Sequence, residues 1–387
     1  MTHRRSLIAL AALLAATTAG AQTQGVSKTE IVIGTIQDLS GPIAAFGKQV
    51  RQGMVLRVDE INEQGGINGR KLVLKVEDSS YDPKKAVLGA QKLVNQDKIF
   101  AMVAHIGTPQ NIATFPVLFP KNILNFFPVS AGREMYEGPN ERLKYAFAPT
   151  YFEGLRRSVP MLVKEKNAKR VCSLYQDDDY GLEVQRGADE GLKGLGMTMV
   201  EKTTYKRGAT DFSSQVQKLA ASQCDLVVLG TIIRETIGAI ATARKMNYNP
   251  TFLASGAAYT DLIHKLGGAP MNGLYATMFA QHPYTDEAAQ PIRFWANKYN
   301  TKFGEEPSVY SIYGYNAVDV FAKAASQAGA NLNTDSFIKA MDGMTVPPDI
   351  FGSAALTFSA TKRLGASAAR LSQLQDGRWK VVSGYFD

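Results

Sequence analysis

Four loops rich in glycine and hydroxyl side chains carry the clearest binding chemistry in this sequence. They are Ser40-Gly41-Pro42, Gly107-Thr108-Pro109, Ser130-Ala131-Gly132 and Ser255-Gly256-Ala257-Ala258. Each follows a short apolar run of the kind that forms a buried strand. Glycine lets the backbone approach a bound group closely, and backbone amides and hydroxyls suit a carboxylate or a phosphate. Because such turns also follow strands for structural reasons alone, the loops predict an anion site only as a set.

Catalysis and metal binding have no comparable pattern. The sequence contains neither a Gly-x-Ser-x-Gly nucleophile elbow nor a His-Glu-x-x-His zinc motif. His105, His264 and His282 are far apart in the chain, and Asp177-Asp178-Asp179 does not complete a calcium-binding loop. We therefore expect no enzymatic activity, no metal site and no cofactor.

Two similar series of strands and helices position these loops. Short β-branched runs alternate with stretches of helical period, which is typical of βαβ units and parallel sheets. The first series predicts strands at 31–36, 71–77, 100–104 and 123–127, with helices at 48–64, 83–95 and 109–119. The second predicts strands at 170–175, 197–203, 225–230 and 251–254, with helices at 181–195, 211–221, 234–246 and 259–266.

The remaining third of the chain must pack onto these two halves. It predicts a strand at 274–279, helices at 286–303, 308–328 and 334–344, a strand at 355–358 and a hairpin at 368–382 around Asp376-Gly377. The predicted fold is α/β, with two doubly wound Rossmann-like lobes joined by a three-segment hinge near 145–149, 274–279 and 351–358. Lobe 1 would comprise 25–147 plus 279–352, and lobe 2 would comprise 148–278 plus 353–387.

The N-terminus predicts export. Arg4 and Arg5 precede an apolar run at 7–16 and the small triplet Ala19-Gly20-Ala21, which is the pattern of a cleaved signal peptide at 1–21. About ten apolar residues are roughly half of what spans a bilayer. We therefore expect a protein located in the periplasm.

Charge and cysteine content narrow the possible partners. Lys and Arg outnumber Asp and Glu by 43 to 35 without basic runs, and export removes nucleic acid as a partner. We expect a monomer. The two cysteines, Cys172 and Cys224, permit either a disulfide or two buried free thiols, and the sequence leaves both open.

Ligands of open parallel sheets bind beyond the carboxyl ends of the strands, where helix N-termini point outward. That rule selects the loops at 38–47, 105–109, 128–133, 177–181, 231–234 and 255–259. Phe46, Tyr180 and Tyr310 would add apolar walls, although single aromatic residues more often serve packing alone.

Six segments along the chain together form a recognisable pattern. They are Asp38-Leu39-Ser40-Gly41-Pro42 with Phe46-Gly47, Gly65-Gly66-Ile67-Asn68-Gly69-Arg70, Asp82-Pro83, Asp179-Tyr180-Gly181, Gly208-Ala209-Thr210-Asp211-Phe212 and Tyr313 to Ala317. In these segments the chain resembles one family, the periplasmic leucine/isoleucine/valine-binding proteins of ABC transporters. The resemblance implies a type I periplasmic-binding-protein fold that encloses a small carboxylate ligand between hinged lobes. It also implies a membrane permease of an ABC transporter as partner.

The resemblance also assigns ligand-binding residues. The carboxylate-holding loop falls on Gly107 and Thr108, the second loop of lobe 1 on Ser130 and Ala131, and the aromatic walls on Phe46, Tyr180 and Tyr310.

Two positions depart from the family pattern. Relatives that bind α-amino acids hold the ammonium with a carboxylate where this chain has Gly256, and a further family aromatic falls on Ile232 or Ile233. A buried ammonium without a charged partner is unfavourable by several kcal/mol. The ligand class therefore stays open between a hydrophobic amino acid and an aromatic or aliphatic acid without an amine.

Charged residues near the predicted loops offer few alternatives. Arg133, Arg234 and Glu235 are the nearest, and we expect Arg234 and Glu235 to face solvent. A periplasmic sensor that signals to a receptor remains an alternative to transport, because the same lobes would serve either role.

Overall fold

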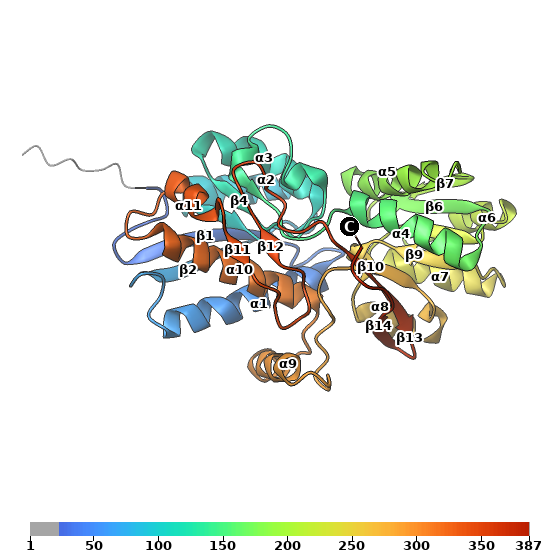
Figure 1. Cartoon of the computed structure of the whole chain (residues 1–387). Coiled ribbons are helices and arrows are strands. Elements are labelled where there is room, and N and C mark those ends of the chain that lie inside the picture. The colour runs from blue at the N-terminus through green and yellow to red at the C-terminus, as the bar shows by residue number, and fades with distance from the viewer. Residues whose placement is uncertain (1–22, 387) are drawn as a thin grey trace, which may run out of the picture.

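Two sheets organise the chain, and they lie at opposite ends of the molecule (Figure 1). The computed structural model describes residues 23–386, so the predicted signal peptide at 1–21 lies outside the described residues. Within 23–386, every helix is too short or too polar to cross a bilayer.

Lobe 1 is built on a sheet of five parallel strands. Its elements are β1 (Glu30–Gln37), β2 (Lys71–Asp78), β3 (Ala101–Val103), β4 (Leu124–Phe126), β5 (Lys144–Tyr145), α1 (Ala44–Glu63), α2 (Pro83–Asn95), α3 (Thr108–Leu118), α10 (Val309–Ala328) and α11 (Thr334–Met341). The strand order is β2-β1-β3-β4-β5. The helices α1 and α10 pack together on one face, and α2 and α3 pack together on the other. Because both faces are covered, β3 and β4 consist of buried residues throughout.

Lobe 2 repeats this plan. Its elements are α4 (Tyr151–Lys166), β6 (Val171–Gln176), α5 (Asp179–Lys193), β7 (Glu201–Tyr205), α6 (Ser213–Ala221), β8 (Leu226–Gly230), α7 (Arg234–Lys245), β9 (Thr251–Ala254), α8 (Leu262–Gly267), β10 (Tyr275–Met278), β13 (Arg370–Gln375) and β14 (Arg378–Val381). The strand order is β14-β13-β10-β9-β8-β6-β7. Its five parallel strands follow the same permutation as those of lobe 1, and the C-terminal hairpin extends the sheet antiparallel to β10.

The repeat extends to a glycine behind the first strand of each lobe. A Cβ on Gly47 would lie 1.9 Å from the backbone oxygen of Asp38, and a Cβ on Gly181 would lie 1.9 Å from that of Gln176. In both lobes the first helix can therefore approach the exit of the first strand only because glycine stands there.

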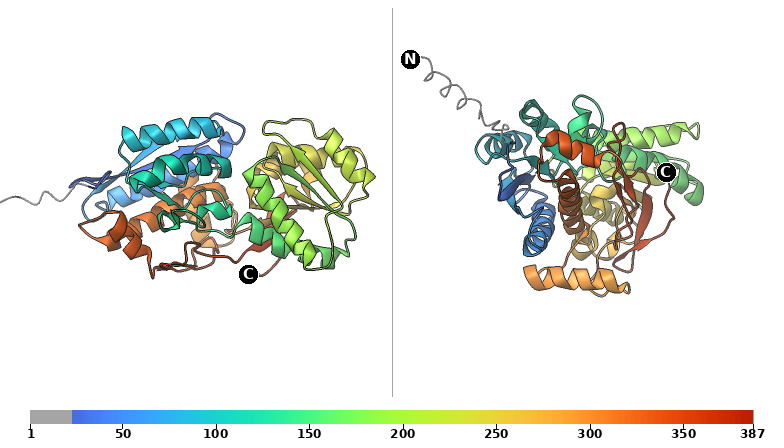
Figure 2. Two further views of the ribbon diagram at one scale, coloured as in Figure 1. Left: turned by 90° about the horizontal axis from the view of Figure 1, so that it is seen from above. Right: turned by 60° about the vertical axis from the view of Figure 1, so that its left-hand side comes forward.

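Three segments connect the lobes, which lie side by side in Figure 2. The first crossing follows β5 and the second follows β10, close to the predicted positions. The third was predicted near 351–358, but β12 (Leu356–Thr357) pairs with β11 (Thr345–Val346), and Phe358 packs against Phe127 and Tyr145 of lobe 1. The third crossing therefore lies further along the chain, where the amide of Gly365 donates to the backbone oxygen of Ala146 at 2.8 Å.

The predicted helices and strands occur within about four residues of their predicted bounds. The helix α4 and the short strands β5 and β11 are missing from the prediction. A further helix, α9 (Gln290–Phe303), leaves the hinge and packs its Trp295 and Tyr299 against Leu56 of α1.

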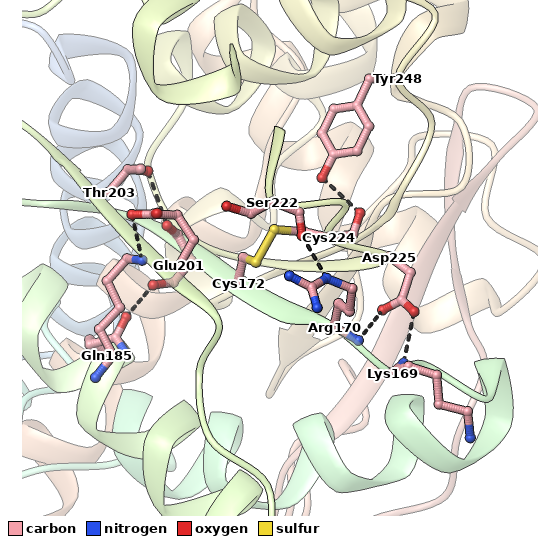
Figure 3. Close-up of a disulfide and its surroundings, with 12 residues drawn as sticks. Lys169, Arg170, Cys172, Gln185, Glu201, Thr203, Ser222, Cys224, Asp225 and Tyr248 are labelled. Carbon is pink, nitrogen blue, oxygen red and sulfur yellow. Dashed lines mark hydrogen bonds between the residues drawn. A yellow bond between two sulfur atoms is a disulfide. The ribbon is translucent and has the colours of Figure 1, made fainter. Parts of the chain in front are cut away.

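The two cysteines are paired. Cys172 on β6 forms a disulfide with Cys224, which precedes β8 (Figure 3). Close to the disulfide, the Asp225 carboxylate accepts the backbone amides of Lys169 and Arg170 at 2.7 and 3.0 Å. The disulfide thus links two neighbouring strands within lobe 2 and does not connect the two lobes.

Candidate ligand-binding site

A buried cavity lies between the lobes, at the carboxyl ends of both parallel sheets. Its volume is about 90 Å³, which is several times what one water molecule needs. All nine residues predicted from the sequence line it: Phe46, Gly107, Thr108, Ser130, Ala131, Tyr180, Ile232, Gly256 and Tyr310. They meet because the order of each sheet reverses beside its first strand, and the loops on either side of that reversal open toward the same crevice.

Lobe 1 contributes a pair of hydroxyl groups at the start of α3. Thr108 Oγ1 and Ser130 Oγ lie 2.8 Å apart, and both side chains are nearly inaccessible to solvent. Gly107 precedes the helix with φ of 96°, a backbone conformation that favours glycine. This geometry turns the chain from β3 into α3, whose first turn leaves the amides of Thr108 and Gln110 free of partners among the described residues, whereas Pro109 carries no N–H.

Several helices begin at the cavity, among them α1, α3, α5 and α10, and they differ in how their first amides are bonded. Within residues 23–386 no side chain caps the first turn of α1, but just before it the Asp38 carboxylate accepts the amides of Gly41 and Ile43. Asp178 accepts the amides of Tyr180 and Gly181 at the start of α5, and Ser308 accepts that of Tyr310 at the start of α10. By contrast, none of the described side chains caps α3. Because uncapped amides and the helix dipole favour an anion, α3 is the end at which a carboxylate fits best.

Lobe 2 contributes an aromatic wall in which the Tyr180 hydroxyl is already engaged. The Tyr180 hydroxyl donates to the backbone oxygen of Thr231 at 2.9 Å and lies 2.8 Å from Ser255 Oγ. Tyr151 meets the Tyr180 ring edge to face with centroids 4.9 Å apart. The ring faces are therefore available to an apolar part of a ligand.

Two aromatic residues of lobe 1 complete the wall and reach the other lobe. Phe46 and Tyr310 stack with centroids 3.7 Å apart, and the Tyr310 hydroxyl donates to the backbone oxygen of Ala257 at 3.0 Å. The amide of Tyr151 donates to the backbone oxygen of Ala131 at 2.9 Å. These bonds join residues of both lobes around the same space.

The cavity is electrically neutral in its side chains. Among the described residues, no Asp, Glu, Lys, Arg or His lines it. Burial raises the pKa of Tyr151 to about 12 and holds the pKa of Tyr180 and of Tyr310 well above the usual value, so these phenols stay protonated. Charge complementarity to a ligand must therefore come from the amides and hydroxyls.

Gly256 offers only backbone at the position where the family resemblance led us to expect an acid. It begins a short 3-10 helix, Gly256–Ala258, and a Cβ at this position would lie 3.2 Å from the backbone oxygen of Thr277. Ile232, which also lines the cavity, has an apolar side chain that is 4% exposed. Neither residue offers a partner to an ammonium group.

The charged residues near the predicted loops lie outside the cavity. Arg133 spans the lobes and donates twice to the buried Glu183 carboxylate, at 2.9 and 3.0 Å. Arg234 is exposed as expected, but Glu235 is buried, which corrects the expectation that it faces solvent. It is buried because the first turn of α7 packs against lobe 2, and this burial raises the pKa of Glu235.

The Glu134 carboxylate, which was not identified from the sequence, lies close to the lobe 1 loops. Glu134 Oε2 and Thr108 Cγ2 flank Gly132, each 2.9 Å from where a Cβ of that residue would stand. Burial raises the pKa of Glu134, and its Oε2 has no hydrogen-bond partner among the described residues. Glu134 does not line the cavity.

Other cavity residues were missed because the strand-end rule does not select them. Tyr81 follows β2, on the far side of β1, and its backbone oxygen accepts from Arg207 of lobe 2 at 3.2 Å. Phe147, Tyr151 and Phe279 belong to the hinge crossings or to α4. The only signal for them in the sequence was that the hinge would border the site.

Metal binding has no structural support in this region or elsewhere in residues 23–386, where no three His, Cys, Asp or Glu residues are grouped to hold an ion. Asp178 of the acidic triplet instead caps α5 and pairs with Arg207 at 3.2 Å. Groups of the protein itself therefore already occupy the Asp178 carboxylate.

Comparisons with known proteins agree with this architecture. Residues 30–378 match the family model described as periplasmic binding protein. An amino acid binding protein of Pseudomonas aeruginosa is 28% identical over 306 residues, which are 78% of this chain and 80% of that protein.

Two solved structures share the fold at lower identity. The fatty acid ABC transporter substrate-binding protein of Thermomonospora curvata is 23% identical, with a TM-score of 0.85 and coverage of 94% of each chain. A solute binding protein of an ABC transporter of R. palustris, in complex with benzoate, is 15% identical, with a TM-score of 0.81 and coverage of 92% of this chain and 96% of its own.

Proposed function

Because the chain belongs to the periplasmic binding protein family, we propose that it is the periplasmic solute-binding component of an ABC uptake transporter of the branched-chain amino acid type. Its ligand in this proposal is a small molecule with a carboxylate and an apolar body. The protein acts as a monomer, reaches the periplasm through a cleaved signal peptide at 1–21 and delivers its ligand to a membrane permease.

One observation carries the ligand class. The uncapped N-terminus of α3, with the hydroxyls of Thr108 and Ser130, opens into a cavity whose described lining has no charged side chain. A carboxylate gains hydrogen bonds there that no side chain of the protein already provides. An ammonium in the same cavity would lose its hydration without gaining a charged partner.

The relatives leave room for either kind of acid. One is described as an amino acid binding protein, one as a fatty acid binder, and one was solved with benzoate. Since Gly256 replaces the ammonium partner that the family resemblance leads us to expect, we favour an acid without an amine. Phe46, Tyr180, Ile232 and Tyr310 would then surround its apolar body.

Binding proceeds by closure in this proposal. Each lobe supplies part of the wall, so the contacts are complete only when the lobes meet, and the ligand shifts the population toward the closed form. The permease would recognise the closed form. Catalysis has no part in this cycle.

Isothermal titration of the mature protein with benzoate, 4-hydroxycinnamate and leucine tests the ligand class. We expect heat of binding from at least one acid and weaker or no binding of leucine. Tight leucine binding together with no heat of binding from either acid would contradict the proposal that the ligand lacks an amine. Silence from all three would count against the small-carboxylate class as a whole.

A further inference from the structure

A second cavity lies at the hinge, directly behind the ligand cavity. Its volume is about 130 Å³, compared with about 90 Å³ for the ligand cavity. Phe147 and Phe279 line both cavities, and their rings meet edge to face with centroids 6.0 Å apart. Phenyl rings make no hydrogen bonds, so packing alone keeps this partition closed.

One face of α10 runs past both cavities. Tyr310 and Tyr313 line the ligand cavity, and Asn316, Val320 and Lys323 line the hinge cavity. Spacings of three and four residues place all five on the same side of the helix. At 1.5 Å per residue, this shared wall is roughly 20 Å long. The two cavities therefore follow one another along α10, and the contact between Phe147 and Phe279 separates them.

The hinge cavity is apolar in effect, although charged residues border it. Nine of its fourteen lining residues are apolar. Asp319 is neutralised by Arg57 and Lys323, each at 2.8 Å. Asp349 accepts hydrogen bonds from Asn316 at 2.7 Å and from the amide of Ser353 at 3.0 Å. These charges already have partners, so the cavity favours an uncharged, apolar guest.

One polar group in the hinge cavity has no partner. Ser353 is 5% exposed, and its Oγ makes no hydrogen bond among the described residues. An apolar chain end leaves this hydroxyl unpaired, as it is without a guest, so Ser353 does not oppose such a guest.

We propose that the hinge cavity receives the far end of the ligand, and that the ligand is an elongated monocarboxylate whose apolar chain passes between Phe147 and Phe279. This inference rests on the proposed function, because the carboxylate must be held at α3. The chain of such a ligand contacts Phe147, Phe279 and Ala354, which belong to the first crossing, to the second crossing and to the segment leading into the third. The affinity of the site should then depend on the chain length of the acid.

A series of straight-chain acids from butanoate to decanoate, titrated into the mature protein by calorimetry, tests the proposal. Each added methylene that is buried should tighten binding by about fourfold. We expect the affinity to keep rising through octanoate in the wild-type protein. In Ala354→Phe, whose ring fills the hinge cavity, the rise should stop at shorter acids while butanoate binds as before.

Two further variants keep the outcome clear. Val320→Phe fills the same cavity from α10 and replaces Ala354→Phe if that variant does not fold. Ala330→Phe, at an exposed position beyond α10, should behave like the wild-type protein.

Each alternative outcome has a distinct meaning. If short acids bind and longer ones bind no better, or if the cavity-filling variants leave the length dependence unchanged, the elongated ligand is wrong while the proposed function stands. If acids of every length and benzoate all fail to bind, the proposed function is wrong and the inference falls with it.

Discussion

At the scale of single residues, the Thr108 hydroxyl should contribute more to ligand binding than to stability. In Thr108→Val the shape is kept but a hydrogen bond to the carboxylate is lost. Such bonds to charged groups contribute about 1.5–3 kcal/mol, so benzoate affinity measured by calorimetry should fall by roughly 10- to 100-fold. Thr114→Val is the matched control, because Thr114 is equally buried in α3 but donates to the backbone oxygen of Asn111. Equal losses in both variants would contradict a ligand-binding role for Thr108.

His105 should make the stability of the protein depend on pH. It is fully buried at the end of β3, and burial lowers its pKa to about 3, whereas an unfolded histidine titrates near 6.5. Above about pH 6.5 the His105 imidazole is neutral in both the folded and the unfolded protein. Between about pH 6.5 and 3 the unfolded state binds the extra proton, so stability falls as pH falls, by about 1.4 kcal/mol per pH unit.

The variant His105→Leu should lose this part of the pH dependence. Urea unfolding between pH 4 and 6 measures the slope directly. Asn125→Leu is a suitable control, because Asn125 is a buried polar residue of the neighbouring strand that does not titrate. A slope that is unchanged in His105→Leu would mean that His105 takes up its proton in the folded state.

The location of residues at the cavity was predictable from sequence where the fold rule and the family pattern agreed. Both selected Gly107 and Thr108, and the structure brings these residues to the cavity. Tyr81 and Glu134 were not predictable, because their position depends on how the lobes meet and on how a loop folds back. No local pattern of residue types records either event.

At the scale of elements, the close packing of α1 and α10 should control the aromatic wall. A Cβ on Gly314 would lie 2.1 Å from the backbone oxygen of Val50, so Gly314→Ala must push the helices apart. Overpacking of this kind destabilises by about 1–3 kcal/mol. Because Tyr310 lies one turn away on α10, benzoate affinity should fall together with the melting temperature.

The control for this variant is Gly194→Ala. Gly194 has helical φ of −61° at the end of α5, and a Cβ there would lie 3.5 Å from its nearest neighbour. Its melting temperature should match that of the wild-type protein within error. If Gly314→Ala is equally harmless, α1 and α10 have room to adjust and the stacked pair of Phe46 and Tyr310 is not set by their separation.

The one long helix of the described residues that the prediction missed contains a helix-breaking residue, although α3, which contains Pro116, was predicted. The helix α4 contains Pro160, which removes one backbone hydrogen bond and usually marks a helix end. Here the Thr150 cap and the packing of α4 against α5 maintain the helix. Similarly, the third crossing was placed too early, because the pairing of β11 with β12 holds that segment on lobe 1.

At the scale of the whole molecule, the bridge between Arg133 and Glu183 should favour closure. The Glu183 side chain is 1% exposed and receives two hydrogen bonds from Arg133 across the lobes. In Arg133→Met the carboxylate keeps only Arg186 at 3.3 Å, and opening rehydrates it. Apparent benzoate affinity should fall by roughly tenfold or more, and the ligand-free protein should have a larger radius of gyration by X-ray scattering.

Arg156→Met provides the comparison. Arg156 has similar exposure, but its partner Glu153 belongs to the same helix, so this pair spans no lobe boundary. Its scattering profile and affinity should stay at wild-type values. Identical behaviour of the two variants would mean that the interlobe pair has no special influence on closure.

The two-lobe plan itself was predictable, because its signal repeats along the chain. Alternating strand and helix patterns occur twice, and a parallel sheet with helical crossovers has few allowed topologies. The prediction assigned 279–352, and with it α9 to α11, to lobe 1, but the contacts by which these helices pack there were not predictable from periodicity. They join residues more than 200 positions apart, such as Arg57 with Asp319 at 2.8 Å.

The return of α10 to lobe 1 also determines the order in which the two lobes can fold during synthesis. During synthesis the first sheet is complete at Tyr145, yet one of its faces is covered only by α1 until Val309–Ala328 has been made. The parallel sheet of lobe 2 lies in one continuous stretch and can mature earlier. A growing chain that lacks α10 has neither a finished first lobe nor Tyr310, so it cannot capture a solute before nearly all of its sequence exists.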